Sequence, residues 1–157
     1  MAEKIPVGSD HAGYELKEQI KQYLAELGYE AEDFGAGGPE SVDYPDFAAE
    51  VAGRVSRGER ARGILVCSTG IGMSIAANKY RGVRAALAFT EELAEISRRH
   101  NDANVLALGG KTTPPELARR IVKKWLETEF DGGRHSRRVE KIAESEKNPA
   151  GYRENNS

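Results

Sequence analysis

The sequence lacks several features that mark particular classes of protein. Among its 157 residues there is one cysteine, so no disulfide can form within the chain and nothing favours an oxidising compartment. No apolar run approaches the length of a membrane span, and the first residues lack the apolar stretch of a signal peptide. These absences predict a cytoplasmic protein with no membrane partner.

A strong excess of either charge is also missing. The chain has 23 basic and 25 acidic side chains, a formal charge of −2 at pH 7. Such a chain has no overall attraction to nucleic acid, so any anion must be bound locally. Its length suffices for one domain with a proper core and is too short for two. We therefore expect one domain over residues 1–147, followed by a polar, mobile tail over residues 148–157.

Short apolar segments alternate with amphipathic helical segments along the chain. This order predicts an α/β fold, with a parallel sheet covered by helices on both faces. The unbroken apolar runs of the third, fourth and fifth strands favour burial on both faces. The five expected strands are Lys4–Gly8, Tyr29–Phe34, Ile64–Cys67, Val83–Phe89 and Asn104–Leu108.

Residues between the strands predict where helices begin and end. Pro45 suits the first position of the helix that carries Phe47, Val51 and Val55. Thr113-Pro114-Pro115-Glu116 has the spacing of a capping box, so a helix is expected from about Pro114 to Glu129. A last helix follows Gly132-Gly133, with three apolar residues on one side: Val139, Ile142 and Ala143.

The segment of greatest chemical interest follows the third strand and runs from Cys67 through Ser74. A thiol near a helix N-terminus feels the positive end of the helix dipole, which favours the thiolate, a usable base or nucleophile. Gly70 and Gly72 allow backbone N–H groups to approach a bound anion closely. The alternative is a small, inert, buried side chain, and position alone leaves both interpretations open.

Other polar segments flank the predicted strands. Asp10-His11 follows the first strand, His100-Asn101 lies near the start of the fifth, and Lys111 follows the fifth. Ligands of open α/β sheets bind beyond the carboxyl ends of the strands, so we expect these segments to share one rim with the cysteine loop. Histidine gives and takes protons at neutral pH, which favours acid–base chemistry. A helix cap beside a solvated imidazole is the alternative for Asp10-His11.

The densest basic cluster runs from Arg134 to Arg138. These two arginines are four residues apart, so a helix places both on one face. Guanidinium groups match phosphate oxygens, and a bound phosphate is one explanation of the pair. The other is a solvated helix face neutralised by Glu140 and Glu144. Nucleic acid is not an expected partner, because the patch is short and has no aromatic stacking platform beside it in the sequence.

Six segments, taken in order over roughly residues 4–146, resemble the ribose-5-phosphate isomerase B family. They are Gly8-Ser9-Asp10-His11-Ala12-Gly13, Asp43-Tyr44-Pro45, Cys67 through Gly72, Ala76-Ala77-Asn78-Lys79, His100-Asn101-Asp102-Ala103-Asn104 and Gly132-Gly133-Arg134-His135. The resemblance implies a Rossmann-like three-layer α/β/α sandwich with a five-stranded parallel sheet. It also implies a homodimer or dimer of dimers with shared active sites, and no metal ion or organic cofactor.

The reaction implied by the resemblance interconverts D-ribose 5-phosphate and D-ribulose 5-phosphate, a step of the pentose phosphate pathway, through an enediolate. Cys67 is then the base and Thr69 assists proton transfer, while His100, helped by Asp10, opens the sugar ring. His11, Arg134 and Arg138 are implied to hold the phosphate, and Asn101 to contact the sugar. The full substrate-binding set is His11, Tyr44, Ser68, Gly70, Ile71, Gly72, Asn101, Lys111, Arg134 and Arg138.

Three residues depart from the family's pattern. Ser68 stands where many relatives have glycine, which narrows the loop. Lys111 stands where arginine is common, so a two-pronged phosphate contact becomes a point charge. Met73 stands where another branch carries a glutamate base, which leaves Cys67 as the better candidate.

Alternative functions remain open at this point. Allose 6-phosphate or a tetrose phosphate could replace the pentose, because that choice depends on pocket depth. A phosphocysteine carrier could use the same loop but gives no role to His100 or to the arginine pair. A phosphatase is disfavoured, since Met73 takes the place of its arginine. A non-catalytic sugar-phosphate sensor is a third class, and nucleotides suit it poorly because the loop lacks their fingerprints.

Overall fold

Five strands form one parallel sheet in the computed structural model, which describes residues 1–148. The strands are β1 (Lys4–Ser9), β2 (Glu30–Asp33), β3 (Gly63–Cys67), β4 (Ala85–Leu87) and β5 (Val105–Gly109). Their order across the sheet is β2-β1-β3-β5-β4, and every neighbouring pair is parallel. Of the predicted tail over residues 148–157, all but Asn148 lies outside the described residues.

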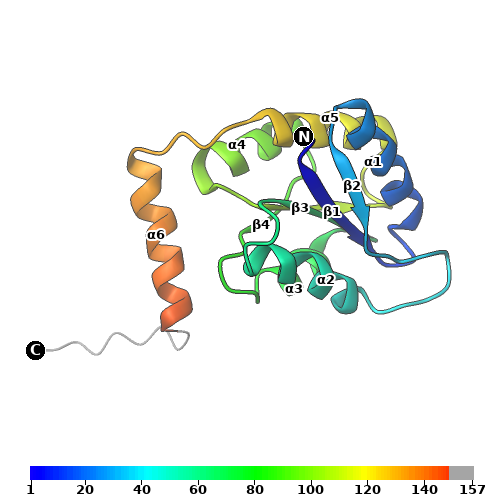
Figure 1. Ribbon diagram of the computed structural model, residues 1–157, viewed down its shortest axis with the longest axis horizontal. Helices are drawn as coiled ribbons and strands as arrows, with labels where there is room; N and C mark the ends of the chain where they lie inside the picture. The colour runs from blue at the N-terminus through cyan, green and yellow to red at the C-terminus, as the bar shows by residue number, and fades with distance from the viewer. Residues whose placement is uncertain (149–157) are drawn as a thin grey trace, which may run out of the picture.

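Helices cover both faces of this sheet (Figure 1). One face carries α1 (Tyr14–Glu26), α4 (Glu91–Asn101) and α5 (Pro115–Glu127), and the other carries α2 (Tyr44–Ser56) and α3 (Ile71–Ala77). Helix α6 (Arg134–Lys147) stands to one side and packs against α4. The architecture is the Rossmann-like three-layer α/β/α sandwich that was predicted. No helix among residues 1–148 is long and apolar enough to cross a membrane.

The alternation of side chains along β3 decides where the cysteine lies. Ile64 and Val66 point into the apolar cluster under α1 and α5, which includes the fully buried Trp125. Leu65 and Cys67 point into the other cluster, under α2 and α3. The pleat of a central, fully buried strand therefore places the sulfur on the α2–α3 face, at the carboxyl end of the sheet.

The fourth strand differs from the prediction. The sequence predicts a buried central strand over Val83–Phe89, whereas β4 is three residues long, half-buried and at an edge of the sheet. The apolar run arises because Val83 and Ala88 enter opposite apolar clusters from the loops that flank the strand. Phe89 is 56% exposed.

Two predicted helix starts are displaced. α5 begins at Pro115 without a side-chain cap, so Thr113 does not form a capping box. Thr113 is instead buried in the loop after β5, where its N–H donates to the carbonyl of Gly109 at 2.9 Å. α2 begins one residue earlier than predicted, at Tyr44, so Pro45 takes the second helical position.

Candidate active site

The turn from β3 into α3 closes around the sulfur of Cys67. The residue is 4% exposed, and its Sγ accepts a hydrogen bond from the N–H of Gly70 at 3.2 Å. Gly70 has a φ of 81°, and a side chain there would collide with Leu87 and Leu108. Only glycine adopts this positive φ easily and also leaves room for the two leucines. The close approach of the backbone N–H to the sulfur therefore depends on this residue.

The ends of β1 and β5 lie on either side of this turn, because β3 pairs with both strands. The N–H of Asp10 donates to the carbonyl of Val66 at 3.2 Å, and the N–H of Lys111 donates to the carbonyl of Ser68 at 2.9 Å. The buried Asp10 carboxylate accepts the N–H of Gly13 at 3.0 Å and so fixes the turn that leads into α1. Backbone hydrogen bonds thus hold Asp10 and Lys111 beside the cysteine turn.

Two further predicted binding residues lie at the same edge. The exposed His11 accepts the N–H of Val42 on Nδ1 at 3.2 Å. A neutral imidazole that accepts on Nδ1 carries its proton on Nε2, which is then a donor for an anion. The ring of Tyr44, at the start of α2, packs so closely on Gly72 that a Cβ there would lie 2.6 Å from it. Tyr44 therefore covers the cysteine turn.

The remaining predicted residues form a second group. It lies at the edge of the sheet formed by the amino ends of the strands, opposite the carboxyl ends where Cys67 lies. α4 runs into β5, so His100 and Asn101 at its C-terminal end lie near the amino end of that strand. Arg134 and Arg138 lie in the first two turns of α6, which packs against α4. The expectation that His100-Asn101 shares a rim with the cysteine loop is therefore wrong within a single chain, whereas it is confirmed for Asp10-His11 and Lys111. A helix that precedes a parallel strand ends at the strand's amino end, whereas ligands of such sheets bind at the carboxyl end.

The two arginines of this second group have no acidic partner. Both side chains are exposed, and within residues 1–148 neither Arg134 nor Arg138 forms an ion pair with Glu140, Glu144 or any other carboxylate. The structure therefore does not show the alternative in which Glu140 and Glu144 neutralise these arginines. Two unpaired guanidinium groups one turn apart favour a bound anion.

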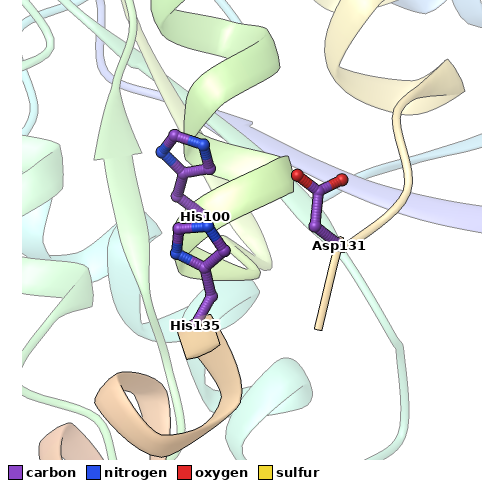
Figure 2. Close-up of side chains that lie close together, drawn as sticks. All are labelled: His100, Asp131 and His135. Atoms are coloured by element: carbon purple, nitrogen blue, oxygen red, sulfur yellow. The ribbon is translucent and has the colours of Figure 1, made fainter. Parts of the chain in front are cut away.

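His100 also has a neighbour that the sequence does not reveal. Its ring stacks on that of His135, with centroids 4.2 Å apart and planes at 10° (Figure 2). Burial lowers the pKa of His135, and the positive charges of His100, Arg134 and Arg138 lower it further. These effects favour the neutral form of the His135 imidazole.

Two residues near His100 were missed as functional candidates. His135 lies in a segment that carries the family resemblance, but the pattern assigns it no role. Asp131 has no signal at all in the sequence, because the loop between α5 and α6 brings it to His100 only in the folded chain.

Comparison with known proteins defines the class to which this fold and site belong. A family model described as Ribose/Galactose Isomerase matches residues 5–142, and the chain belongs to that family. Within it, the chain is a sugar phosphate isomerase of the ribose-5-phosphate isomerase B type.

Three relatives illustrate the match. Ribose-5-phosphate isomerase B of Escherichia coli (strain K12) is 48% identical over 139 residues, which are 88% of this chain and 93% of that protein. A solved structure of ribose-5-phosphate isomerase B from Clostridium thermocellum has a TM-score of 0.91 at 55% identity, covering 93% of this chain and 99% of that one. D-erythrulose-4-phosphate isomerase of Pectobacterium atrosepticum is 42% identical over 139 residues, 88% of this chain and 91% of that protein.

Proposed function

We propose that the protein interconverts D-ribose 5-phosphate and D-ribulose 5-phosphate, with Cys67 as the base. The observation that carries the proposal is the sulfur of Cys67, held by a backbone N–H at the carboxyl edge of the sheet and flanked by Asp10 and Lys111. Relatives named as ribose-5-phosphate isomerase B support the pentose as the substrate.

The reaction is a proton transfer between neighbouring carbons. The thiolate of Cys67 removes the proton from C2 of the open-chain aldose, and the electron pair of that bond moves toward the C1 oxygen, giving an enediolate. The proton returns to C1, while Thr69 moves a proton between the two substrate oxygens, so the ketose forms without gain or loss of atoms. N–H groups of residues 68–72 stabilise the negative oxygen, at about 3 kcal/mol for each well-placed donor.

We infer that each active site is shared between two subunits. Within one chain His100, Asn101, Arg134 and Arg138 lie at the opposite edge of the sheet from Cys67. A sugar bound at Cys67 therefore receives these side chains from a second copy of the chain. His11 together with Arg134 and Arg138 of the partner subunit then holds the phosphate.

Ring opening uses groups from both subunits in this arrangement. His100 of the partner subunit protonates the ring oxygen of the furanose, and Asp10 assists at the same end of the sugar. Asn101 of the partner subunit contacts the sugar hydroxyls, and Lys111 adds a point charge near the phosphate. The remote phosphate supplies binding energy that holds the reacting carbons against Cys67.

Exposed apolar side chains support the dimer. On the apolar side of α6, Ile142 is 47% exposed and Ala143 is exposed as well, because α6 stands off the body of its own domain (Figure 1). Ile142 also lines a groove of about 460 Å³ between α6 and the edge strand β4. Ile71 and Ile75 of the neighbouring α3 are 53% and 58% exposed. Apolar surface of this kind is typical of protein contacts, and a second copy fits it.

The substrate is tested with a panel of phosphorylated aldoses. We expect the highest kcat/KM for ribose 5-phosphate, with allose 6-phosphate and erythrose 4-phosphate well below it. A higher value for either competitor would replace the substrate within the same chemistry. Tight binding of every sugar without turnover would instead establish a sensor.

The same panel bears on the phosphocysteine carrier. A carrier must present its sulfur to another protein, and a sulfur that is 4% exposed disfavours such a transfer. Mass spectrometry of Cys67 after incubation with a phosphodonor is expected to find no phosphocysteine. Its presence would favour the carrier over the isomerase.

A further inference from the structure

Three possible metal ligands meet where α4 and α6 come together. His100 lies in the last turn of α4, Asp131 in the loop before α6, and His135 in the first turn of α6. One ligand atom from each side chain lies within 4.8 Å of the other two (Figure 2). Two imidazole nitrogens and one carboxylate oxygen are a donor set that Zn²⁺ and related transition-metal ions prefer.

Backbone hydrogen bonds hold the three residues in place. The N–H of Asp131 donates to the carbonyl of Arg99 at 3.0 Å, which ties the loop to α4 beside His100. The N–H of His135 donates to the carbonyl of Gly132 at 3.1 Å and fixes the first turn of α6. Within residues 1–148 neither imidazole of the cluster has a hydrogen-bond partner, so their nitrogen lone pairs are available.

Joint coordination requires one of the rings to turn. In a stack with planes at 10° the nitrogen lone pairs, which lie in the ring planes, run parallel and do not converge on one ion. The outer torsion of a histidine side chain has a broad energy profile, so a turn about the Cβ–Cγ bond costs little. His100 is half-buried whereas His135 is buried, and His100 is thus the ring that is free to turn.

The surrounding charge selects the kind of ion. Arg99 pairs with the carboxylate of Asp131 at 3.2 Å, and the positive charges of Arg134 and Arg138 act on His135. A hard cation that is held mainly by opposite charge, such as Mg²⁺, gains little here. An ion bound through nitrogen donors is less affected.

We propose that His100, Asp131 and His135 form a binding site for a divalent transition-metal ion of the Zn²⁺ type, and that this ion inhibits the enzyme. The inhibitory part rests on the proposed function: the ion binds the nitrogen of His100 that must carry the proton for ring opening. The metal is then a competitor of the sugar and not a cofactor of the reaction.

The site is tested by metal binding to the full-length protein after treatment with a chelator. Calorimetry with Zn²⁺, and the visible absorption of Co²⁺ as a second probe, are expected to show one ion per chain and no comparable binding of Mg²⁺. His135→Asn and the exposed Asp131→Asn each should weaken Zn²⁺ binding at least tenfold. His11→Asn, which removes the histidine outside the cluster, should leave it unchanged, as should Cys67→Ala.

Several results would overturn the site. These are no binding of Zn²⁺ by the wild type, unchanged affinity in both cluster variants, loss of binding in Cys67→Ala instead, or equally tight binding of Mg²⁺. Because Asp131 is exposed, its variant keeps the test valid even if His135→Asn fails to fold.

Inhibition is measured separately, with ribose 5-phosphate as substrate. Zn²⁺ should inhibit the wild type, a chelator should restore the rate, and His135→Asn should need at least tenfold more Zn²⁺ for the same inhibition. Binding without inhibition would overturn the inhibitory part alone. Binding by a protein that turns over no sugar phosphate would refute the proposed function and leave the metal site standing.

Discussion

The carboxyl edge of the sheet and the α4–α6 junction are built in different ways. At the carboxyl edge, backbone hydrogen bonds between the ends of three strands fix Asp10, Cys67 and Lys111 relative to one another. At the junction, Arg134 and Arg138 are exposed on a helix that packs mainly on α4. The first region is complete in one chain, whereas the second presents its side chains outward. This difference is the reason for our proposal that one subunit carries halves of two different active sites.

The largest effect is expected from removal of the thiol at the carboxyl edge. Cys67→Ala should lower kcat by about 10³-fold, because the proton transfer loses its base. Affinity for ribose 5-phosphate, measured by calorimetry, should change by less than about twofold, since the phosphate contacts remain. Ser74→Ala, in the adjoining helix, is the control and should keep the wild-type rate. A Cys67→Ala variant with wild-type kcat would remove the cysteine from the mechanism.

A smaller and direction-dependent effect is expected at the junction from His100→Asn. Ribose 5-phosphate closes to a furanose, whereas ribulose 5-phosphate is open-chain because its terminal oxygen carries the phosphate. Loss of the ring-opening acid should lower kcat/KM on the aldose by about 10²-fold. Initial rates from the ketose should fall far less. Equal losses in both directions would reject ring opening as the role of His100.

The arginine pair is expected to act on binding and not on chemistry. Arg138→Ala should raise KM by about tenfold with kcat nearly unchanged, because a charge-assisted contact to the phosphate is lost. Arg137→Ala removes the same charge from the neighbouring position of α6 and serves as the control. If both variants raise KM equally, net charge and not a specific contact holds the phosphate.

An ion pair between a buried lysine and an exposed aspartate lies next to the carboxyl edge. The fully buried Lys17 donates to Asp33 at 2.6 Å and to the carbonyl of Ala36 at 2.8 Å, at the start of the loop whose Val42 bonds His11. Lys17→Met leaves both oxygens without this donor and should lower the free energy of unfolding by about 2 to 3 kcal/mol. The half-buried Lys21 bonds the same carboxylate, so Lys21→Met should cost less than about 1 kcal/mol.

The same pair predicts the response to acid. Burial by itself raises the pKa of Asp33, but hydrogen bonds from Lys17, Lys21 and the Gly35 N–H outweigh it and lower the pKa from 3.8 to about 2. The folded-state pKa lies below the unfolded one, so this stabilisation is present above pH about 4 and is lost as the pH falls toward 2. Urea denaturation between pH 5 and 2, at about one-unit steps, should show a shallower loss for Lys17→Met. An identical slope would place the acid sensitivity elsewhere.

Residues whose position follows from their own strand are well predicted from the sequence. The apolar run before Cys67 and the glycines after it suffice to place the sulfur at the carboxyl end of β3, since a parallel strand followed by a helix has few alternatives. The five strands, their parallel arrangement and the helices on both faces follow from the same alternation of apolar patterns.

Positions that depend on tertiary contacts are predicted poorly. An apolar run resembles a central strand even when, as around β4, its ends enter the core from loops. His100 was placed on the wrong edge because proximity to β5 in sequence does not say which end of the strand it adjoins. Asp131 and His135 meet His100 because the loop before α6 bonds to α4 and α6 packs on it, and no local pattern encodes these contacts. The apolar side of α6 is visible in the sequence, but what covers it is not.

Complementation between two defective subunits measures the sharing of active sites most directly. Cys67→Ala and the double variant Arg134→Ala/Arg138→Ala are each purified, unfolded in urea, mixed in equal amounts and refolded together, with each variant refolded alone as the reference. Activity is assayed with ribose 5-phosphate well below the wild-type KM, where the loss of the arginines leaves little activity. In a mixed dimer one of the two sites pairs an intact Cys67 with intact arginines, so random assortment should restore about a quarter of the wild-type activity. A mixture no more active than the average of the two variants alone would contradict the shared site.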